Sequence, residues 1–363
     1  MQAALDLACR GEGRTRPNPP VGAVVVRDQK IIGGGYHPRA GDPHAEVFAL
    51  QEAGDKARGA DLYVTLEPCC HTGRTGPCTA AIIRAGIARV FIGTRDPNPK
   101  VAGRGVAKLQ SAGIEVTEGI LEDACRDLIA PFARHMTTGL PLVIHKGAIT
   151  LDGFTATRSG DSRWVSSPES REQVHRLRDR VDAIMVGIGT VLADNPRLTT
   201  RLPEGGRSAD RIVVDSKLQI PEDAPLLALD DGVQTLIATT AEADPEKVER
   251  LQRAGATILR VAADAAGQVD LTALCRELGR RDYLYVLLEG GSRLASGMWR
   301  SGLVQRVQIY VAPKFYAGDD GVHLFAGAGP KLMADSRLLT NVRYRQCGCD
   351  MVVEGDVSSC LPV

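Results

Sequence analysis

Three short segments in the first part of the chain contain residues that commonly bind zinc. They are His44-Ala45-Glu46, Glu67-Pro68-Cys69 and Pro77-Cys78. One imidazole and two thiolates can hold a tetrahedral zinc ion and leave its fourth position open to water. Such a zinc lowers the pKa of that water. Glu46, two residues after the histidine, is placed to carry protons from the water to a leaving nitrogen.

The spacing leaves more than one ligand set open, because eight residues separate Cys69 from Cys78 and two of them are Cys70 and His71. Helix signals favour Cys78. A proline precedes it, an apolar run follows, and Gly86 closes the run, which is typical of a helix with proline in its first turn. A thiol at a helix N-terminus has a lowered pKa. Zinc deaminases combine a His/Cys/Cys zinc with a nearby Glu, so the segments predict hydrolytic deamination.

Strands and helices alternate around these segments and again after a break at 137–141. This alternation predicts an α/β protein whose sheets carry helices on both faces. We place the domain boundary at the break, which gives domains 1–139 and 140–363. We expect helices over 2–10, after His44, after Cys78 and over 106–112 and 121–135, and strands at 21–26, 61–66, 89–93, 114–116, 142–148, 183–187, 211–215, 235–238, 283–288 and 306–311.

A glycine turn in the second half is a candidate phosphate site. The predicted strand ending at Glu289 is followed by Gly290-Gly291-Ser292, and a helix should begin near Arg293. Glycines at such a turn let backbone N–H groups approach a phosphate at the helix N-terminus. The turn lacks the full Gly-x-Gly-x-x-Gly fingerprint, so an ordinary turn without a ligand stays open. The charged helix segment 173–179 is expected to be a solvated face.

Composition excludes several classes of protein. Lys+Arg and Asp+Glu both number 44 in the 363 residues. Residues 1–139 contain 17 Lys+Arg and 15 Asp+Glu, which lacks the basic excess of a nucleic-acid binder. No stretch approaches the roughly 18 apolar residues of a membrane span. The chain has nine cysteines, an odd number, and shows no signal peptide. We therefore expect a protein of the reducing cytoplasm and not one held together by disulfides.

The chain resembles the bifunctional riboflavin-biosynthesis deaminase–reductase family RibD (RibG in some bacteria). The long spacing from Cys69 to Cys78 is the spacing that this family uses. The other matching segments extend along nearly the whole chain: Pro17-Asn18-Pro19, Gly41-Asp42-Pro43, Tyr63-Val64-Thr65-Leu66, Gly73-Arg74-Thr75, Asp96-Pro97-Asn98-Pro99, Val101-Ala102-Gly103, Leu151-Asp152-Gly153, Ser159-Gly160, Thr190-Val191-Leu192-Ala193-Asp194, Asp215-Ser216 and Ala312-Pro313-Lys314.

The resemblance implies a cytidine-deaminase-like, three-layer α/β/α domain followed by a dihydrofolate-reductase-like α/β domain. It implies zinc and NADPH as cofactors, a phosphorylated pyrimidine as substrate, no nucleic acid or membrane partner, and a homo-oligomer, either a dimer or a tetramer. Two consecutive reactions follow: hydrolysis of the 2-amino group of a diaminopyrimidinone ribosylamine phosphate, then reduction of the ribosyl chain to a ribityl chain.

The resemblance also implies roles for single residues. Glu46 would protonate the ring nitrogen and the departing amine, and the Asn18 amide would hold the pyrimidine, although a simple turn asparagine is an equal alternative. Lys146, Asp194 and Glu289 would serve the reduction, with Asp194 also at the nicotinamide and Glu289 at the substrate. The cofactor would contact Ala148, Trp164, Thr190, Ser216, Gly291, Ser292, Arg293, Leu294, Ala295, Ser296 and Gly297, and the substrate would contact Ser162, Ser166, Arg178, Leu198 and Arg201.

Three positions depart from the family pattern. Asn195 stands where a second Asp is common, Ser166 where Thr is common, and Cys70 where Ser or Ala is frequent. The first two changes keep a polar group. Two other functions remain as alternatives, a nucleic-acid deaminase with an appended domain and a binding protein with a degenerate reductase half. The neutral first domain argues against the former, and the presence of Lys146 and Asp194 argues against the latter.

Overall fold

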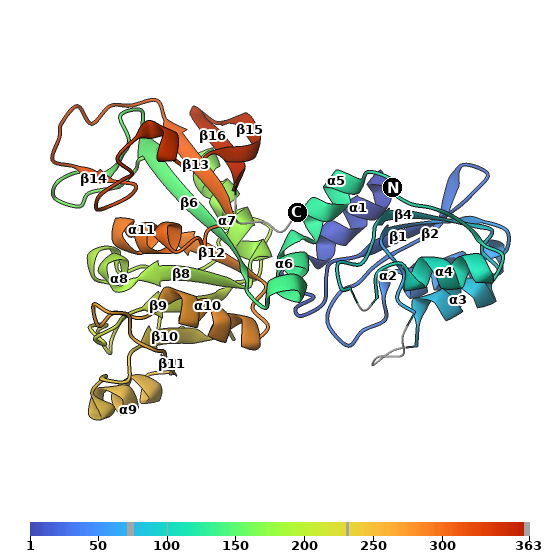
Figure 1. Ribbon diagram of the computed structural model, residues 1–363, viewed down its shortest axis with the longest axis horizontal. Helices are drawn as coiled ribbons and strands as arrows, with labels where there is room; N and C mark the ends of the chain where they lie inside the picture. The colour runs from blue at the N-terminus through green and yellow to red at the C-terminus, as the bar shows by residue number, and fades with distance from the viewer. Residues whose placement is uncertain (71–75, 100, 230–231, 359–363) are drawn as a thin grey trace. The chain divides into compact units, whose positions relative to one another are not determined.

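The computed structural model describes residues 1–70, 76–99, 101–229 and 232–358. Its internal contacts divide the chain into two units, Met1–Gly139 and Leu140–Val363, and each unit has its own sheet (Figure 1). None of the helices in these described ranges combines the length and the hydropathy needed to cross a membrane.

The first unit is built on a five-stranded sheet in the order β2-β1-β3-β4-β5. β1 pairs antiparallel with β2 and β3, whereas β3, β4 and β5 are parallel. The parallel part requires crossover connections, and a helix supplies each of them. The strands are β1 (Gly22–Arg27), β2 (Lys30–Tyr36), β3 (Asp61–Leu66), β4 (Arg89–Thr94) and β5 (Glu115–Thr117).

Helices cover both faces of this sheet, in three α/β/α layers. α2 (Ala45–Ala53), α3 (Cys78–Ala85) and α4 (Arg104–Ser111) share one apolar core with the sheet. α1 (Gln2–Ala8) and α5 (Glu122–Leu128) contact the sheet on its other side. The absence of a side chain at two β2 positions allows the close approach of α2. A Cβ at Gly33 or Gly35 would meet a carbonyl oxygen of α2 at 2.2 or 2.5 Å.

The last helices of the first unit differ from the prediction. One helix was expected over 121–135, but α5 ends at Leu128 and α6 (Ala130–Thr138) begins after Ile129. Ile129 has φ −97° and ψ 7°, outside helical geometry, and Pro131 occupies the first turn of α6. Proline has no N–H and favours a helix start over a helix interior, so it divides the predicted helix in two. The first helix is also shorter than expected, because the chain continues beyond Ala8 as a 3-10 turn, η1 (Cys9–Gly11).

The second unit is built on a nine-stranded sheet in the order β11-β10-β9-β8-β12-β6-β13-β16-β15. The first seven strands of this order are parallel, β16 pairs antiparallel with β13, and β15 pairs antiparallel with β16. The strands are β6 (Leu142–Thr150), β8 (Ala183–Gly187), β9 (Asp210–Val214), β10 (Thr235–Thr239), β11 (Ala256–Arg260), β12 (Tyr285–Glu289), β13 (Arg306–Ala312), β15 (Leu339–Cys347) and β16 (Asp350–Val357), and a separate pair is formed by β7 (Phe154–Ala156) and β14 (Val322–His323).

Two apolar cores lie on opposite faces of this sheet. One contains side chains of α10 (Leu271–Arg280) and α11 (Ser292–Arg300). The other contains side chains of α7 (Pro168–Arg180), α8 (Ile188–Asp194) and α9 (Pro245–Arg253). Alternate residues of β8 enter the two cores, Met185 in the first and Ile184 in the second. Strands buried on both faces explain the continuous apolar runs of the sequence.

The hairpin β15–β16 was not predicted. Its burial pattern is irregular, and most of β15 is exposed. Its turn packs against the start of α7, where Asp350 Oδ2 accepts a hydrogen bond from the Ser167 N–H at 2.7 Å and Ser167 caps the helix. The two short 3-10 segments η2 (Gly54–Ala57) and η3 (Met333–Asp335) complete the described elements.

Candidate functional site

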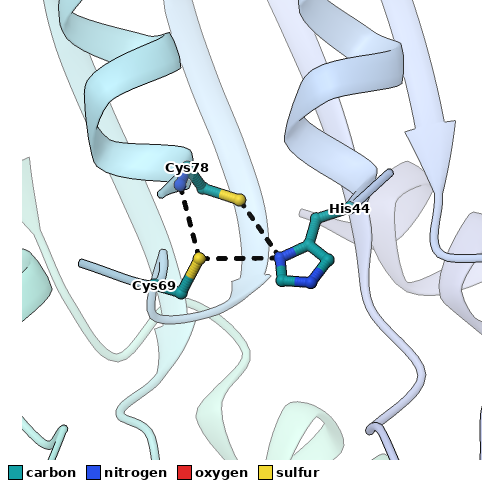
Figure 2. A group of neighbouring side chains, drawn as sticks. All are labelled: His44, Cys69 and Cys78. Carbon is teal, nitrogen blue, oxygen red and sulfur yellow. Dashed lines mark hydrogen bonds between the residues drawn. The ribbon is translucent and has the colours of Figure 1, made fainter. Parts of the chain in front are cut away.

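His44, Cys69 and Cys78 lie together in the first unit (Figure 2). His44 Nδ1 is 3.2 Å from Cys78 Sγ and 3.6 Å from Cys69 Sγ. The three ligand atoms are all within 4.8 Å of one another. One imidazole nitrogen and two sulfurs at these separations form the donor set of a zinc site with one open position.

Three different elements position these side chains. His44 is the N-cap residue of α2, Cys69 follows β3 after two residues, and Cys78 is the first residue of α3. The Cys78 backbone N–H donates to Cys69 Sγ at 3.3 Å. The two helix N-termini therefore meet at the carboxyl end of β3, and their partial positive charges favour thiolates.

The hydrogen bonds within the cluster shift the pKa values of the two thiols in opposite directions. The pKa of Cys69 is lowered to about 4, and the largest cause is the hydrogen bond that Cys69 accepts from Cys78. The hydrogen bond with His44 also lowers this pKa, whereas burial of the thiol raises it. The pKa of Cys78 is raised in turn, because its thiol donates to Cys69 and is buried. The hydrogen bond between His44 and Cys69 is the largest cause that raises the pKa of His44. A bound cation would replace the shared proton, because metal ligation requires both thiolates and a neutral imidazole.

Glu46 lies on the first turn of α2 and is buried, with 3% of its surface exposed. Its Oε2 atom is buried and has no hydrogen-bond partner. Burial raises the pKa of Glu46, and the charge of Cys69 adds to this shift. A carboxyl group with a raised pKa and a free oxygen, beside a zinc-type donor set, fits the proton carrier that the sequence predicts.

Asn18 is connected to the metal cluster through a residue that the sequence did not single out. Asn18 Nδ2 lies 3.0 Å from His37 Nε2, and His37 Nδ1 lies 3.2 Å from the Pro43 carbonyl oxygen. The His37 ring packs edge-on against the His44 ring, with centroids 5.2 Å apart. Burial lowers the pKa of His37. The only sequence signal for His37 was its position seven residues before His44.

Replacing Cys70 with Ser should leave one zinc bound per chain, whereas Cys78→Ser should lose it. Cys70 is half-buried and is not part of the cluster of ligand atoms, while Cys78 completes that cluster. The other alternative ligand, His71, lies outside the described residues. Metal analysis after dialysis checks the expectation. Zinc lost from Cys70→Ser and kept in Cys78→Ser would overturn this ligand assignment.

The second unit brings Lys146, Arg178 and Glu289 together, although they are far apart in sequence. Lys146 and Glu289 are register partners on the parallel strands β6 and β12. Arg178 on α7 donates to both carboxylate oxygens of Glu289, at 2.8 and 2.7 Å, and Lys146 Nζ is 3.9 Å from Glu289 Oε2. Arg178 is therefore not on a solvated face as 173–179 was expected to be, because its side chain is only 12% exposed. Arg176, 41% exposed, fits that expectation.

In this trio of Lys146, Arg178 and Glu289, ion pairing outweighs burial in setting the pKa of the carboxylate. Burial disfavours ionisation of Glu289, but the positive charges of Arg178 and Lys146 outweigh burial and lower the pKa of Glu289 to about 2. Burial lowers the pKa of Lys146, and Glu289 opposes that shift. A buried ammonium whose pKa is lowered can give up its proton more readily than a surface lysine.

Arg201 lies next to the same trio. Its guanidinium donates to Thr199 Oγ1 at 2.9 Å, and its backbone N–H donates to His175 Nδ1 at 3.3 Å. The Thr199 carbonyl oxygen accepts from Arg178 at 3.0 Å. Burial is the largest cause that lowers the pKa of Arg201, and the positive charge of Arg178 adds to this shift. The same two causes lower the pKa of His175 to about 4. The excess of positive charge suits an anionic ligand, and His175 is a neighbour that the sequence did not indicate.

The predicted glycine turn follows β12. Gly290 and Gly291 have φ of 62° and 71°, and α11 begins at Ser292, whose hydroxyl donates to the His323 carbonyl. A Cβ at Gly290 would be 3.0 Å from Thr190 Oγ1, so Thr190 of α8 faces this turn. Farther along α11, Ala295 and Ser296 are buried and a Cβ at Gly297 would meet Leu271, whereas Arg293 and Leu294 are at least partly accessible.

The segment that carries Ser162, Trp164 and Ser166 is held by three cations. Lys314 donates to the Trp164 carbonyl oxygen at 2.8 Å, and the Arg171 guanidinium lies 4.3 Å from the centre of the Trp164 ring. Arg171 also donates to the Ser166 carbonyl oxygen at 2.7 Å, and Arg163 donates to the Asp194 carbonyl oxygen at 3.3 Å. Trp164 as a whole is 63% exposed.

The remaining predicted residues lie in different environments. Ala148 follows Lys146 by two positions on β6 and therefore lies on the same face of the strand. Ser216 follows β9, and its hydroxyl accepts from the Val269 N–H at 2.9 Å. Leu198 is 4% exposed and belongs to an apolar core, so its side chain faces the protein interior. Most of the predicted residues thus gather near the carboxyl ends of β8, β9 and β12, where ligands bind in open α/β sheets.

Two family profiles match the chain. The profile of the cytidine and deoxycytidylate deaminase zinc-binding region matches residues 1–94. The profile of the RibD C-terminal domain matches residues 141–353. The metal cluster lies within the first match, and Lys146, Arg178 and Glu289 lie within the second.

Curated relatives and solved structures match nearly the whole chain. The riboflavin biosynthesis protein RibD of Bacillus amyloliquefaciens is 42% identical, over 97% of this chain and 94% of that protein. RibD of Escherichia coli K12 is 40% identical, over 97% and 96%. The structure of Acinetobacter baumannii RibD (form 1) matches with a TM-score of 0.87 at 36% identity, over 99% and 98%. A Thermotoga maritima structure, described as a diaminohydroxyphosphoribosylaminopyrimidine deaminase/5-amino-6-(5-phosphoribosylamino)uracil reductase, matches with a TM-score of 0.84 at 38% identity, over 98% and 97%.

Proposed function

Because the chain belongs to the RibD family, we propose that residues 1–139 are the deaminase domain and residues 140–363 the reductase domain of a bifunctional riboflavin-biosynthesis enzyme. The enzyme deaminates 2,5-diamino-6-(5-phosphoribosylamino)pyrimidin-4(3H)-one to 5-amino-6-(5-phosphoribosylamino)uracil. It then reduces that product, with NADPH, to 5-amino-6-(5-phosphoribitylamino)uracil.

His44, Cys69 and Cys78 hold the zinc in the first reaction. Zinc supplies Lewis-acid activation of the attacking water. Glu46 moves two protons through its free Oε2 atom. It first takes a proton from the attacking water and gives it to the ring nitrogen. It then takes the proton of the new hydroxyl group on the ring carbon and gives it to the amine, which leaves as ammonia as the carbonyl forms. Asn18 holds the pyrimidine through its side-chain oxygen, because its amide nitrogen is already engaged with His37.

Lys146, Asp194 and Glu289 serve the second reaction. NADPH supplies the electrons for the reduction. Lys146 provides the proton at the sugar, with its ammonium beside the Glu289 carboxylate, and Arg178 holds that carboxylate in place. Arg178 and Arg201 bind the substrate phosphate, with Ser162 and Ser166 along the rest of the substrate. The Leu198 side chain is in the core, so Leu198 contributes only its backbone to this site. The cofactor lies along Ala148, Trp164, Thr190, Asp194, Ser216 and the residues Gly291, Ser292, Arg293, Leu294, Ala295, Ser296 and Gly297.

One observation carries this function: two separate side-chain clusters, a zinc-type donor set and a Lys–Glu–Arg trio, lie in two separate units. The test is to incubate the enzyme with the diaminopyrimidinone substrate, with and without NADPH. A deaminated ribosyl product should form without NADPH, and a ribityl product only with it. Deamination of RNA but not of the free pyrimidine nucleotide would favour the nucleic-acid deaminase instead.

Purified protein should bind NADPH and show no flavin absorbance. The glycine turn at Gly290–Gly291 and the N-terminus of α11 offer backbone N–H groups to a phosphate, which suits a dinucleotide. Fluorescence titration with NADPH and an absorbance spectrum above 400 nm check this expectation. A tightly bound flavin that is reduced during turnover would contradict it.

We also propose that the enzyme is a cytoplasmic homo-oligomer, either a dimer or a tetramer. The free cysteines among the described residues suit a reducing compartment. Light scattering during size-exclusion chromatography measures the oligomeric state, and a monomer at micromolar concentration would exclude both assemblies.

A further inference from the structure

Glu67 is a buried acidic residue that has no part in the chemistry described above. It is 3% exposed and follows β3, two residues before the zinc ligand Cys69. Its carboxylate accepts four backbone hydrogen bonds. Oε1 accepts from the N–H groups of Gly105 (2.8 Å) and Val106 (3.3 Å), and Oε2 accepts from those of Gly103 (2.9 Å) and Asp96 (3.2 Å).

Three of these donors place the carboxylate at the N-terminus of α4. Gly103 is the N-cap residue of this helix, and Gly105 and Val106 belong to its first turn, where backbone N–H groups have no partner within the helix. A negative charge is also favourable at this end of a helix. The contact is close, because a Cβ at Gly105 would lie 2.2 Å from the Pro68 carbonyl oxygen. Glu67 and Pro68 are thus packed directly on α4.

A second helix holds the other end of the same short segment. The Cys78 N–H donates to Cys69 Sγ at 3.3 Å, and the Thr79 N–H and hydroxyl donate to the Cys69 carbonyl oxygen at 3.1 and 3.3 Å (Figure 2 shows the first of these contacts). Both Cys78 and Thr79 begin α3. The segment from Glu67 to Cys69 is therefore held between the N-termini of α3 and α4.

We propose that Glu67 is a positioning residue of the zinc centre, which holds Cys69 in register with His44 and Cys78 by binding the N-terminus of α4. α3 binds Cys69 at one end of the segment and carries the ligand Cys78 itself. Glu67 fixes the other end of the segment, next to β3, by its hydrogen bonds to the N-terminus of α4. The inference rests on the zinc site of the proposed function and adds to it a residue outside the ligand set.

The test is the zinc affinity of Glu67→Gln in the full chain, measured by competition with a chromogenic chelator at a temperature where the zinc-free protein is folded. Glutamine keeps the size but places an NH₂ group against backbone N–H donors, so it forfeits two of the four hydrogen bonds. Loss of a group that orients a metal ligand typically weakens metal binding by about 10–100-fold. Glu67→Gln should show a loss of this size, with unchanged reductase activity, and Glu67→Asp should restore part of the affinity.

Glu118→Gln is the matched control. Glu118 accepts from Arg95, the residue before Asp96, at 2.6 and 2.9 Å, so it contacts the same loop without touching the helix N-terminus. Its zinc affinity should equal that of the wild type. Zinc affinity of Glu67→Gln within twofold of the wild type would overturn this inference alone, as would a variant whose first unit stays unfolded at saturating zinc. A wild-type chain that binds no zinc would overturn the proposed function as well.

Discussion

Replacing Glu46 with Gln should stop deamination and leave reduction of 5-amino-6-(5-phosphoribosylamino)uracil nearly intact. Glu46 is buried and has one carboxylate oxygen without a partner, and burial raises its pKa, so it is suited to exchange protons. Glutamine has nearly the same shape but transfers no proton. The loss of general acid–base help typically costs about 10²–10⁴-fold in rate. Chromatography of the products formed from each substrate measures the two activities separately.

The control for this variant is Asp55→Asn, which removes an exposed carboxylate just after the same helix. Both activities should be unchanged in that protein. Zinc should remain at one per chain in Glu46→Gln, because Glu46 is not part of the ligand cluster. If Glu46→Gln lost both activities while it still melted cooperatively with zinc bound, the two sites would not be independent.

Replacing Lys146 with Met should have the reverse effect. Reduction should fall by about 10²–10⁴-fold, the range typical for a lost proton donor, and the ribosyl intermediate should accumulate in the presence of NADPH. Methionine fills much of the space of the lysine stem, and the Glu289–Arg178 ion pair stays intact. The second unit should therefore remain folded, since no buried charge loses its last partner. Quantification of ribosyl and ribityl products over time checks this.

Lys331→Met is the matched control, because Lys331 is an exposed lysine of the same unit. It should reduce substrate at the wild-type rate. NADPH affinity should also be retained in Lys146→Met, since the role assigned to Lys146 is at the sugar. Wild-type reduction by Lys146→Met would exclude Lys146 as the proton donor and transfer that role to another group near Glu289.

The metal cluster could be predicted from sequence because its chemistry is local. His44, Cys69 and Cys78 each stand at the beginning of a helix or just after a strand, and short-range signals such as a preceding proline mark those positions. The alternation of strands and helices likewise predicted two layered α/β units. Pro131 carried a local signal too, yet the apolar run around it hid the break between α5 and α6.

Other features depended on tertiary structure alone, because they join residues that the sequence separates widely. Arg178 belongs to a charged stretch that suggested a solvated face, but parallel pairing of β6 with β12 places Lys146 and Glu289 where Arg178 must compensate a buried carboxylate. Glu67 belongs to the Glu67-Pro68-Cys69 segment that the sequence singled out. Its four hydrogen-bond donors lie 29 to 39 positions later in the chain, so no local pattern in the sequence indicated them. Residue types and local spacing thus determined which chemistry the protein could hold. Packing of distant segments, driven by burial and by the need to pair buried polar groups, decided which side chains support that chemistry.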